Sequence, residues 1–155
     1  MIILLLALSQ EAWYPLAEGH TWTYQAEDKT EYVRRVASYD AEKKVYRIEE
    51  PFMKEPFSID SGGVKWRDTL WVKFPLKKGE TWETEKDKVK GVVEDEEEIE
   101  VPAGKYKTFR VKLTTPAFEI TMWLAKDVGE VKRTIKVGEK TGTLSLKEFK
   151  KGEKK

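Results

Sequence analysis

The sequence TFRVKLTTPAFEITMWL, residues 108–124, alternates apolar and polar side chains along two consecutive segments. In residues 108–113 the apolar side chains take every second position, and in 118–124 the alternation resumes after a break that contains Pro116. A two-residue period is that of a half-buried β-strand, whereas a helix repeats about every 3.6 residues. The stretch therefore predicts two antiparallel strands joined by a short turn.

The same rhythm recurs in residues 21–26, 45–48, 131–137 and 144–146. Turn-favouring residues separate such segments by hairpin spacings, which antiparallel strands can use and parallel strands cannot. A flat sheet seldom holds this many strands without curling. We expect an all-β single domain: a strongly curved antiparallel meander, half-barrel or barrel, of roughly nine or ten strands.

One pattern occurs twice. Residues 14–24 and 74–84 share aromatic-Pro-Leu-x-x-Gly-x-Thr-Trp at a constant offset of 60. Pro ends one segment, Gly permits a turn with positive φ, and Thr-Trp opens a strand. This repeat is explained either by a duplicated strand-turn-strand unit or by two unrelated segments that use the same residues to form the same turn.

Composition excludes several classes of protein. With 155 residues and a formal charge of +1, the chain has no field that attracts nucleic acid or an anionic membrane. It contains no cysteine, so disulfides, thiolate chemistry and the acylated cysteine of a lipoprotein are all missing. Charged residues make up 37% of the chain, a pattern reported for proteins of heat-loving organisms.

The N-terminus is apolar. Residues 1–8 carry no polar side chain, and Ala7-Leu8-Ser9 offers the small residues that a signal peptidase needs. We interpret residues 1–9 as a truncated signal-peptide remnant, residues 10–150 as one β domain and residues 151–155 as a charged, frayed tail. The alternative for 1–9 is a first buried strand. The apolar run is too short for a membrane span. We expect an exported protein that, without a cysteine, is not lipid-anchored.

Three landmarks carry a family resemblance: residues 14–24, the Val101-Pro-Ala-Gly-Lys-Tyr-Lys107 turn followed by Phe109, and Trp123-Leu-Ala125 followed by residues 128–133. Together they resemble bacterial envelope proteins of the DUF3108-like (TapB-like) kind. The resemblance implies an exported, largely antiparallel β domain of undetermined biochemical role, with a more distant analogy to lipoprotein-carrier half-barrels. Fold analogy carries no function with it.

No catalytic signature stands out. His20 is the single histidine, and its place in a turn favours a solvent-facing role over a catalytic one. The acidic run 94–100 would put Glu94, Glu96, Glu98 and Glu100 on one strand face, spread along a line instead of converging on a cation. We expect this run to pair with the lysine-bearing segment 105–112 across the turn at 102–104. We expect no catalytic residue, no metal and no cofactor.

Aromatic side chains remain as candidates for binding. Six tryptophans are many for this length, and each is more often core filling than a ligand platform. As a group they indicate an apolar cavity or groove in a curled sheet. The candidate ligand-binding residues are Trp22, Tyr24, Trp66, Trp71, Trp82 and Trp123.

The sequence therefore predicts a non-catalytic, exported β module of the bacterial cell envelope. It would bind a lipid or another apolar or amphipathic small molecule, or an envelope protein, on an aromatic-lined concave face. The first alternative is a structural or assembly component of the envelope. The second is a carboxylate-dependent hydrolase, which would need two acidic side chains facing each other across a pocket.

Overall fold

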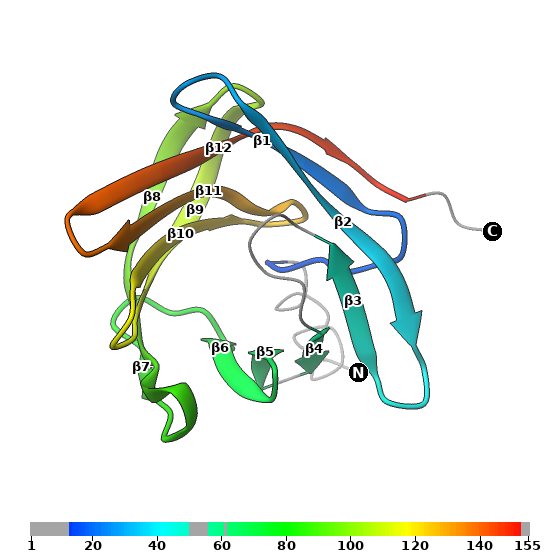
Figure 1. The fold of residues 1–155 in the computed structure, drawn as a ribbon, viewed down its shortest axis with the longest axis vertical. Coiled ribbons are helices and arrows are strands. Elements are labelled where there is room, and N and C mark those ends of the chain that lie inside the picture. The colour runs from blue at the N-terminus through cyan, green and yellow to red at the C-terminus, as the bar shows by residue number, and fades with distance from the viewer. Residues whose placement is uncertain (1–12, 50–55, 61, 153–155) are drawn as a thin grey trace.

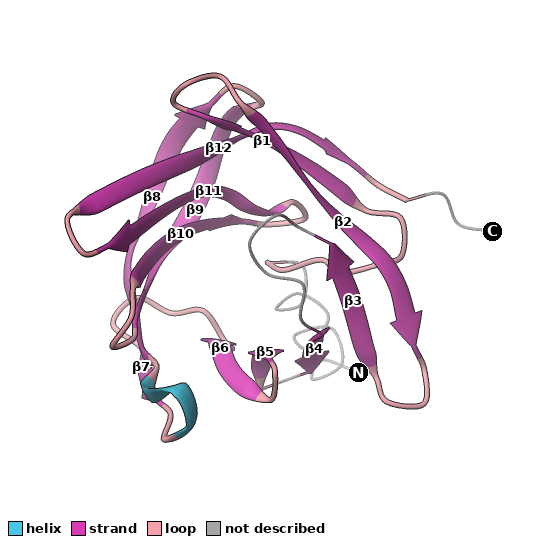
Figure 2. Ribbon diagram, in the orientation of Figure 1, coloured by secondary structure: helices cyan, strands magenta, loops and turns pink. Residues whose placement is uncertain are grey.

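A computed structural model describes residues 13–49, 56–60 and 62–152. These ranges contain no α-helix; they form β-strands and the short 3-10 helix η1 (Lys86–Lys88) (Figures 1 and 2). The strands are β1 (Thr21–Ala26), β2 (Glu31–Asp40), β3 (Val45–Glu49), β4 (Pro56–Asp60), β5 (Gly63–Trp66), β6 (Thr69–Lys73), β7 (Thr81–Glu83), β8 (Lys90–Val101), β9 (Gly104–Thr114), β10 (Glu119–Ala125), β11 (Gly129–Val137) and β12 (Lys140–Lys150).

All the strands belong to one antiparallel sheet of 12 strands, in the order β6-β5-β4-β3-β2-β1-β12-β11-β10-β9-β8-β7. Neighbours in the sheet are neighbours in the chain, as in a meander, with one exception. The first strand pairs with the last, from Thr21 opposite Lys150 to Ala26 opposite Leu144. Two six-stranded halves, β1–β6 and β7–β12, are thereby joined in the middle of the sheet.

The sheet curls into a nearly closed barrel. Its edge strands β6 and β7 come to lie on the same side of the molecule, at the bottom of the view in Figure 1. The buried hydrophobic side chains pack inside this curl, which confirms the predicted all-β, strongly curved antiparallel architecture. The larger members of the core are Tyr14, Trp22, Ile48, Phe57, Trp71, Leu113, Met122, Leu124 and Leu146.

The prediction of nine or ten strands is wrong, because the sheet has 12. The pattern fails between residues 56 and 83, where β4, β5 and β7 have only 5, 4 and 3 residues. Segments this short contain at most two full periods of alternation, so their signal merges with that of the turns around them.

The repeated pattern opens each half of the sheet. Gly19 and Gly79 have φ values of 85° and 89°. The amide of Gly19 donates to the carbonyl of Val36 at 2.9 Å, and that of Gly79 donates to Val93 at 2.8 Å. Strand register matches as well, since Trp22 faces Arg34 in β2 and Trp82 faces Gly91 in β8. The two copies are therefore equivalent in structure as well as in sequence.

Charge pairing between β8 and β9 follows the predicted hairpin. Glu98 lies opposite Lys107 and Glu100 opposite Lys105 across the turn, which confirms that pairing. The predicted common face for Glu94 is wrong. A bulge between Val93 and Asp95 shifts the register, and a one-residue shift turns side chains to the other face. Glu94 accordingly joins Glu97 at the guanidinium of Arg110.

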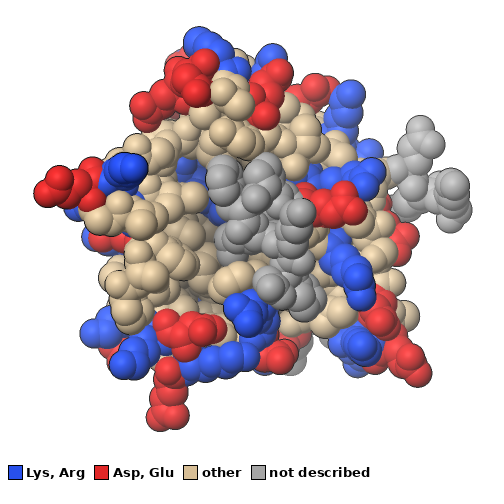
Figure 3. Space-filling view, in the orientation of Figure 1, with Lys and Arg blue, Asp and Glu red and all other residues tan. Residues whose placement is uncertain are grey.

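Surface charge is mixed in sign. Figure 3 shows Lys and Arg interspersed with Asp and Glu around the face that it presents. This distribution agrees with the formal charge of +1. A surface of alternating charges provides no extended attraction for a polyanion.

The predicted signal remnant, residues 1–9, lies outside the described residues, as do residues 153–155 of the predicted tail. The tail's first two residues are described. The Gly152 amide donates to Nδ1 of His20 at 2.9 Å. His20 is half-buried, with its ring 5.5 Å from that of Phe149 and 6.1 Å from that of Trp22. The expected solvent-facing histidine is instead a packing partner of the end of β12.

Gly91 makes room for an indole ring. A Cβ atom at this position would lie 2.0 Å from Cε2 of Trp82, closer than two non-bonded carbons can approach. Trp82 is buried and part of the core. We expect Gly91→Ala to lower the free energy of unfolding by about 1–3 kcal/mol through overpacking, measured by denaturant titration. Gly142→Ala is the control, since its Cβ would meet nothing within 4 Å. Equal stability of the two variants would contradict this packing.

His20 gives a second prediction. Burial lowers the pKa of His20, and the positive charge of Lys151 lowers it further. Because the folded pKa lies below the unfolded value of about 6.5, the unfolded chain binds the proton first as the pH falls. The contact with Gly152 should therefore stabilise the protein above about pH 6.5 and lose that contribution below it.

The protein's single histidine makes this measurement direct. An NMR titration of the imidazole should give a midpoint below about 6.5, and the Gly152 amide signal should move with the same midpoint. A midpoint at or above the ordinary value would count against the buried, neutral imidazole.

Candidate functional site

The six aromatic candidates do not form one group. Trp66 and Trp71 lie together, with ring centroids 5.4 Å apart. Trp22 and Tyr24 lie inside the barrel beside a cluster of charged side chains. Trp82 packs over Gly91, and Trp123 is on the outer face of the sheet, where its indole donates to Glu97 at 2.7 Å. The sequence alone gave no means of dividing them in this way.

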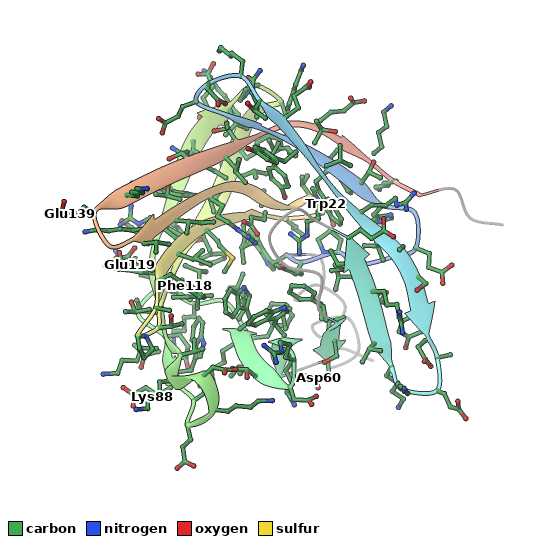
Figure 4. The ribbon with its side chains drawn as sticks, viewed as in Figure 1. Trp22, Asp60, Lys88, Phe118, Glu119 and Glu139 are labelled. Carbon is green, nitrogen blue, oxygen red and sulfur yellow. The ribbon has the colours of Figure 1, made fainter. Side chains whose placement is uncertain are left out.

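Trp66 and Trp71 line a pocket of about 230 Å³. The ring of Phe118, labelled in Figure 4, is 6.4 Å from that of Trp71 and forms part of the same wall. Val89 and the turn at 115–117 complete the apolar lining, and Arg67 and Asp87 supply its charged groups. Three aromatic rings from two separate parts of the sheet therefore face one small volume.

Local backbone geometry builds this pocket. Trp66 pairs with Thr69 across a two-residue hairpin in which Arg67 and Asp68 have φ values of 53° and 66°, the geometry of a type I′ turn. The bulge between Val64 and Lys65 then shifts the register of β6. As a result, Trp71 and its neighbour Val72 are both buried, although a regular strand would turn one of them outward.

Polar contacts tie the rim of the pocket together. The Thr69 hydroxyl donates to Asp87 Oδ2 at 2.7 Å, and the Lys86 ammonium donates to the Arg67 carbonyl at 2.8 Å. The Arg67 guanidinium lies 5.5 Å above the centre of the Trp66 ring. Thr69 is 2% exposed, so its hydrogen bond to a carboxylate is the best shielded of these contacts.

Sequence reasoning missed Phe118, Val89, Thr69 and Asp87 as members of a site. Phe118 was visible only as the first apolar residue of an alternating strand. Asp87 and Thr69 carry no local signal, since their contact depends on how the sheet curls. A turn that needs positive φ at two positions usually contains glycine or asparagine, and Arg67-Asp68 has neither.

A second cluster lies inside the barrel. The buried Arg34, Glu130 and Arg133 are 3%, 2% and 4% exposed. Arg133 donates to Glu130 through both Nε and Nη2, and Arg34 Nη1 lies 3.5 Å from Glu130 Oε2. Arg34 also donates to the Tyr14 hydroxyl at 2.5 Å. Both guanidinium groups thus contact one carboxylate, and Arg34 has the tyrosine hydroxyl as a further partner. Buried charges need such partners.

A bulge explains how Glu130 and Arg133 meet. The register between β10 and β11 shifts between Trp123 and Leu124. Glu130 and Arg133 differ in parity and would face opposite sides of a regular strand, but the shift turns both inward. The sequence shows an alternating segment here and gives no sign of the bulge.

The aromatic candidates Trp22 and Tyr24 support this cluster. The Tyr24 hydroxyl donates to the Glu130 carbonyl at 2.7 Å, and the Arg34 guanidinium lies 5.3 Å above the Trp22 ring. Burial raises the pKa of Tyr14, and the charge of Arg34 opposes that shift. Burial also raises the pKa of Tyr24, with a further contribution from Glu130. Both phenols are therefore neutral hydrogen-bonding groups at neutral pH.

Trp123 has a structural neighbourhood of its own. Lys132 Nζ lies 4.8 Å from the centre of its ring, and Glu97 links its indole to Arg110. The row from Glu97 through Arg110 and Trp123 to Lys132 crosses four adjacent strands on the outer face of the sheet. It is a surface network that joins β8 to β11.

A larger hollow of about 620 Å³ lies beside β2 and β3. Charged side chains dominate its lining, among them Asp40, Lys43, Arg47, Glu49 and Asp68, and none of the described residues that line it is aromatic. Water solvates such a surface well, so its greater size gives little free energy for binding. The smaller aromatic pocket is the stronger candidate for binding.

Within the described ranges, no group of three His, Asp or Glu side chains is arranged to hold a metal ion. In the same part of the chain, no helix is long and apolar enough to cross a membrane.

Comparison with known proteins gives structural neighbours only. No family model matches the sequence, so the resemblance to DUF3108-like proteins stays a prediction. No curated protein matches it. The fold is similar to that of a candidate lipoprotein from Parabacteroides distasonis ATCC 8503, with a TM-score of 0.47 and 11% identity over 89% of this chain and 98% of that one.

It is also similar to a candidate exported protein with a YmcC-like fold from Bacteroides fragilis NCTC 9343. Here the TM-score is 0.49 and the identity 14%, over 89% of this chain and 98% of that one. The descriptions of these two proteins apply to them alone.

The buried charge cluster yields a prediction for stability. Glu130→Gln keeps the shape of the side chain and removes its charge, which leaves two buried guanidinium groups without that carboxylate. We expect a loss of about 3–5 kcal/mol in the free energy of unfolding, measured by denaturant titration.

The matched control is Glu49→Ala. It removes an exposed ion pair with Arg35, in which the side chains are 53% and 60% exposed, and should change stability little. If Glu130→Gln were as stable as this control, the cluster would contribute nothing to the fold.

Proposed function

We propose that this chain is a non-catalytic, exported β module that binds a small, uncharged ring compound in the pocket formed by Trp66, Trp71 and Phe118. The observation that carries the proposal is the convergence of three aromatic rings on one volume of about 230 Å³. Sites for small ligands are concave and mostly apolar, with few polar groups. The lining of this pocket fits that description.

The volume of the pocket favours a compact ligand. A dry protein cavity of about 150 Å³ accommodates benzene, so about 230 Å³ suits one aromatic ring or two fused rings. A long acyl chain needs more room, because each methylene displaces roughly the volume of a water molecule, about 30 Å³. A ring compound thus fits the pocket better than a membrane lipid, the other apolar ligand that the sequence suggests.

The lining also favours binding over catalysis. Asp87 is the one carboxylate among the described residues around the pocket, and it already accepts the Thr69 hydroxyl. A two-carboxylate hydrolase needs a second acid across the substrate. Export rests on the apolar N-terminal sequence and on the family resemblance.

Two probes test the proposal: phenol, with one ring, and 2-naphthol, with two fused rings. Saturation-transfer NMR should detect binding of at least one of them to the wild-type protein, and calorimetry should give its dissociation constant. Replacing Trp66 by Leu removes an aromatic contact worth about 0.5–1.5 kcal/mol beyond its buried area. We therefore expect about tenfold weaker binding.

Trp123→Leu is the control, since Trp123 lies on the outer face of the sheet and contacts Glu97 and Lys132. It should bind the probes as the wild type does. Failure of the wild-type protein to bind either probe would refute the proposed function, and equal weakening by both substitutions would place the ligand elsewhere.

A further inference from the structure

The pocket lies where the barrel is not closed by backbone hydrogen bonds. One wall comes from the β5–β6 hairpin, with Trp66 and Trp71, and the other from Asp87, Val89 and the turn before β10. β6 and β7 are the two edges of the sheet, and in the described ranges no backbone hydrogen bond joins them. Paired strands are held about 4.8 Å apart by their ladder, but the two walls here lack that constraint.

The two halves of the sheet meet a second time, and there the junction is closed by backbone hydrogen bonds. β1, the structural equivalent of β7, pairs with β12 from Thr21 to Ala26. The equivalent partner for β7 would be β6, the last strand of the opposite half. Backbone pairing sets the spacing at one junction, and side chains have to set it at the other.

Among the described residues, several side-chain contacts join the β5–β6 hairpin to the segment around β7. One is the exposed hydrogen bond from the Lys86 ammonium to the Arg67 carbonyl, at 2.8 Å. Lys73 and Glu80 form an ion pair at 2.6 Å, with side chains 39% and 33% exposed, and a partly solvated pair of long side chains constrains little. Thr69 donates to Asp87 at 2.7 Å, and Thr69 is 2% exposed. A hydrogen bond to a carboxylate is stronger than a neutral one and has a defined length, and here its donor is buried.

Thr69 is placed to transmit this constraint to the pocket. It lies directly opposite Trp66 in the β5–β6 pairing. Its partner Asp87 belongs to the other wall. The hydrogen bond thus fixes the distance between the Trp66–Thr69 pair on one wall and Asp87 on the other.

We infer that the Thr69–Asp87 hydrogen bond sets the width of the aromatic pocket and thereby selects ligands by ring size. Thr69 acts as a positioning residue, since it affects the ligand through the separation of the two walls. This inference rests on the proposed function and names the residue that determines which ring size the pocket prefers. Loss of the hydroxyl lets the walls part, which favours the larger of two ring compounds.

The substitution Thr69→Val isolates this effect. Valine keeps the branched shape, and Asp87 is exposed, so water solvates its carboxylate when the hydroxyl is gone. The fold should therefore survive, which a thermal unfolding curve checks. Thr69→Ser retains the hydroxyl, and Lys73→Ala removes the partly exposed ion pair as a control.

Calorimetry with phenol and 2-naphthol measures the ratio of their dissociation constants in each protein. In Thr69→Val the ratio should shift toward 2-naphthol by about tenfold, the lower range of what one methylene of pocket space discriminates. Thr69→Ser and Lys73→Ala should keep the wild-type ratio. A merely structural role for Thr69 would weaken both probes equally and leave the ratio unchanged.

An unchanged ratio in a Thr69→Val protein that still binds either probe overturns this inference and leaves the proposed function standing. Absence of binding to the wild-type protein overturns the proposed function itself, and this inference with it.

Discussion

A sheet of 12 strands has to bury one complete face, and this chain has no α-helix among its described residues to cover it. The sheet therefore covers itself by curling until its edges lie near each other (Figure 1). Aromatic and aliphatic side chains together fill the enclosed volume. The position of the pocket follows from the same constraint, since a curled sheet with two short edge strands leaves its gap where those edges meet.

Departures from regular alternation place the residues that matter most. A bulge in the β10–β11 pairing brings Glu130 and Arg133 to the same side. Another, in β5–β6, allows both Trp71 and Val72 to be buried. A third, in β8–β9, brings Glu94 and Glu97 to one guanidinium. Each bulge leaves one residue unpaired in the hydrogen-bond ladder. It also brings side chains together in an arrangement that a regular strand cannot make.

The sequence predicts the fold class because the two-residue period is a local property, clearest in the long strands β9 and β10. It also predicts the charge pairing between Glu98 and Lys107, since both residues belong to one hairpin. It fails for the strands of residues 56–83, which are too short for a period to emerge. It fails again for the pocket, because Thr69 and Asp87 meet only through the curl of the whole sheet, and nothing local marks their contact.

The union of the first strand with the last has a consequence for the order of events during biosynthesis. Among the described strands, β1 is synthesised first but lacks its neighbour β12 until that strand, the last of them, has been made. Long-range pairing of this kind is slow, and it comes late in folding. The central seam of the sheet, between β1 and β12, can therefore close only after the hairpins of the first half are available.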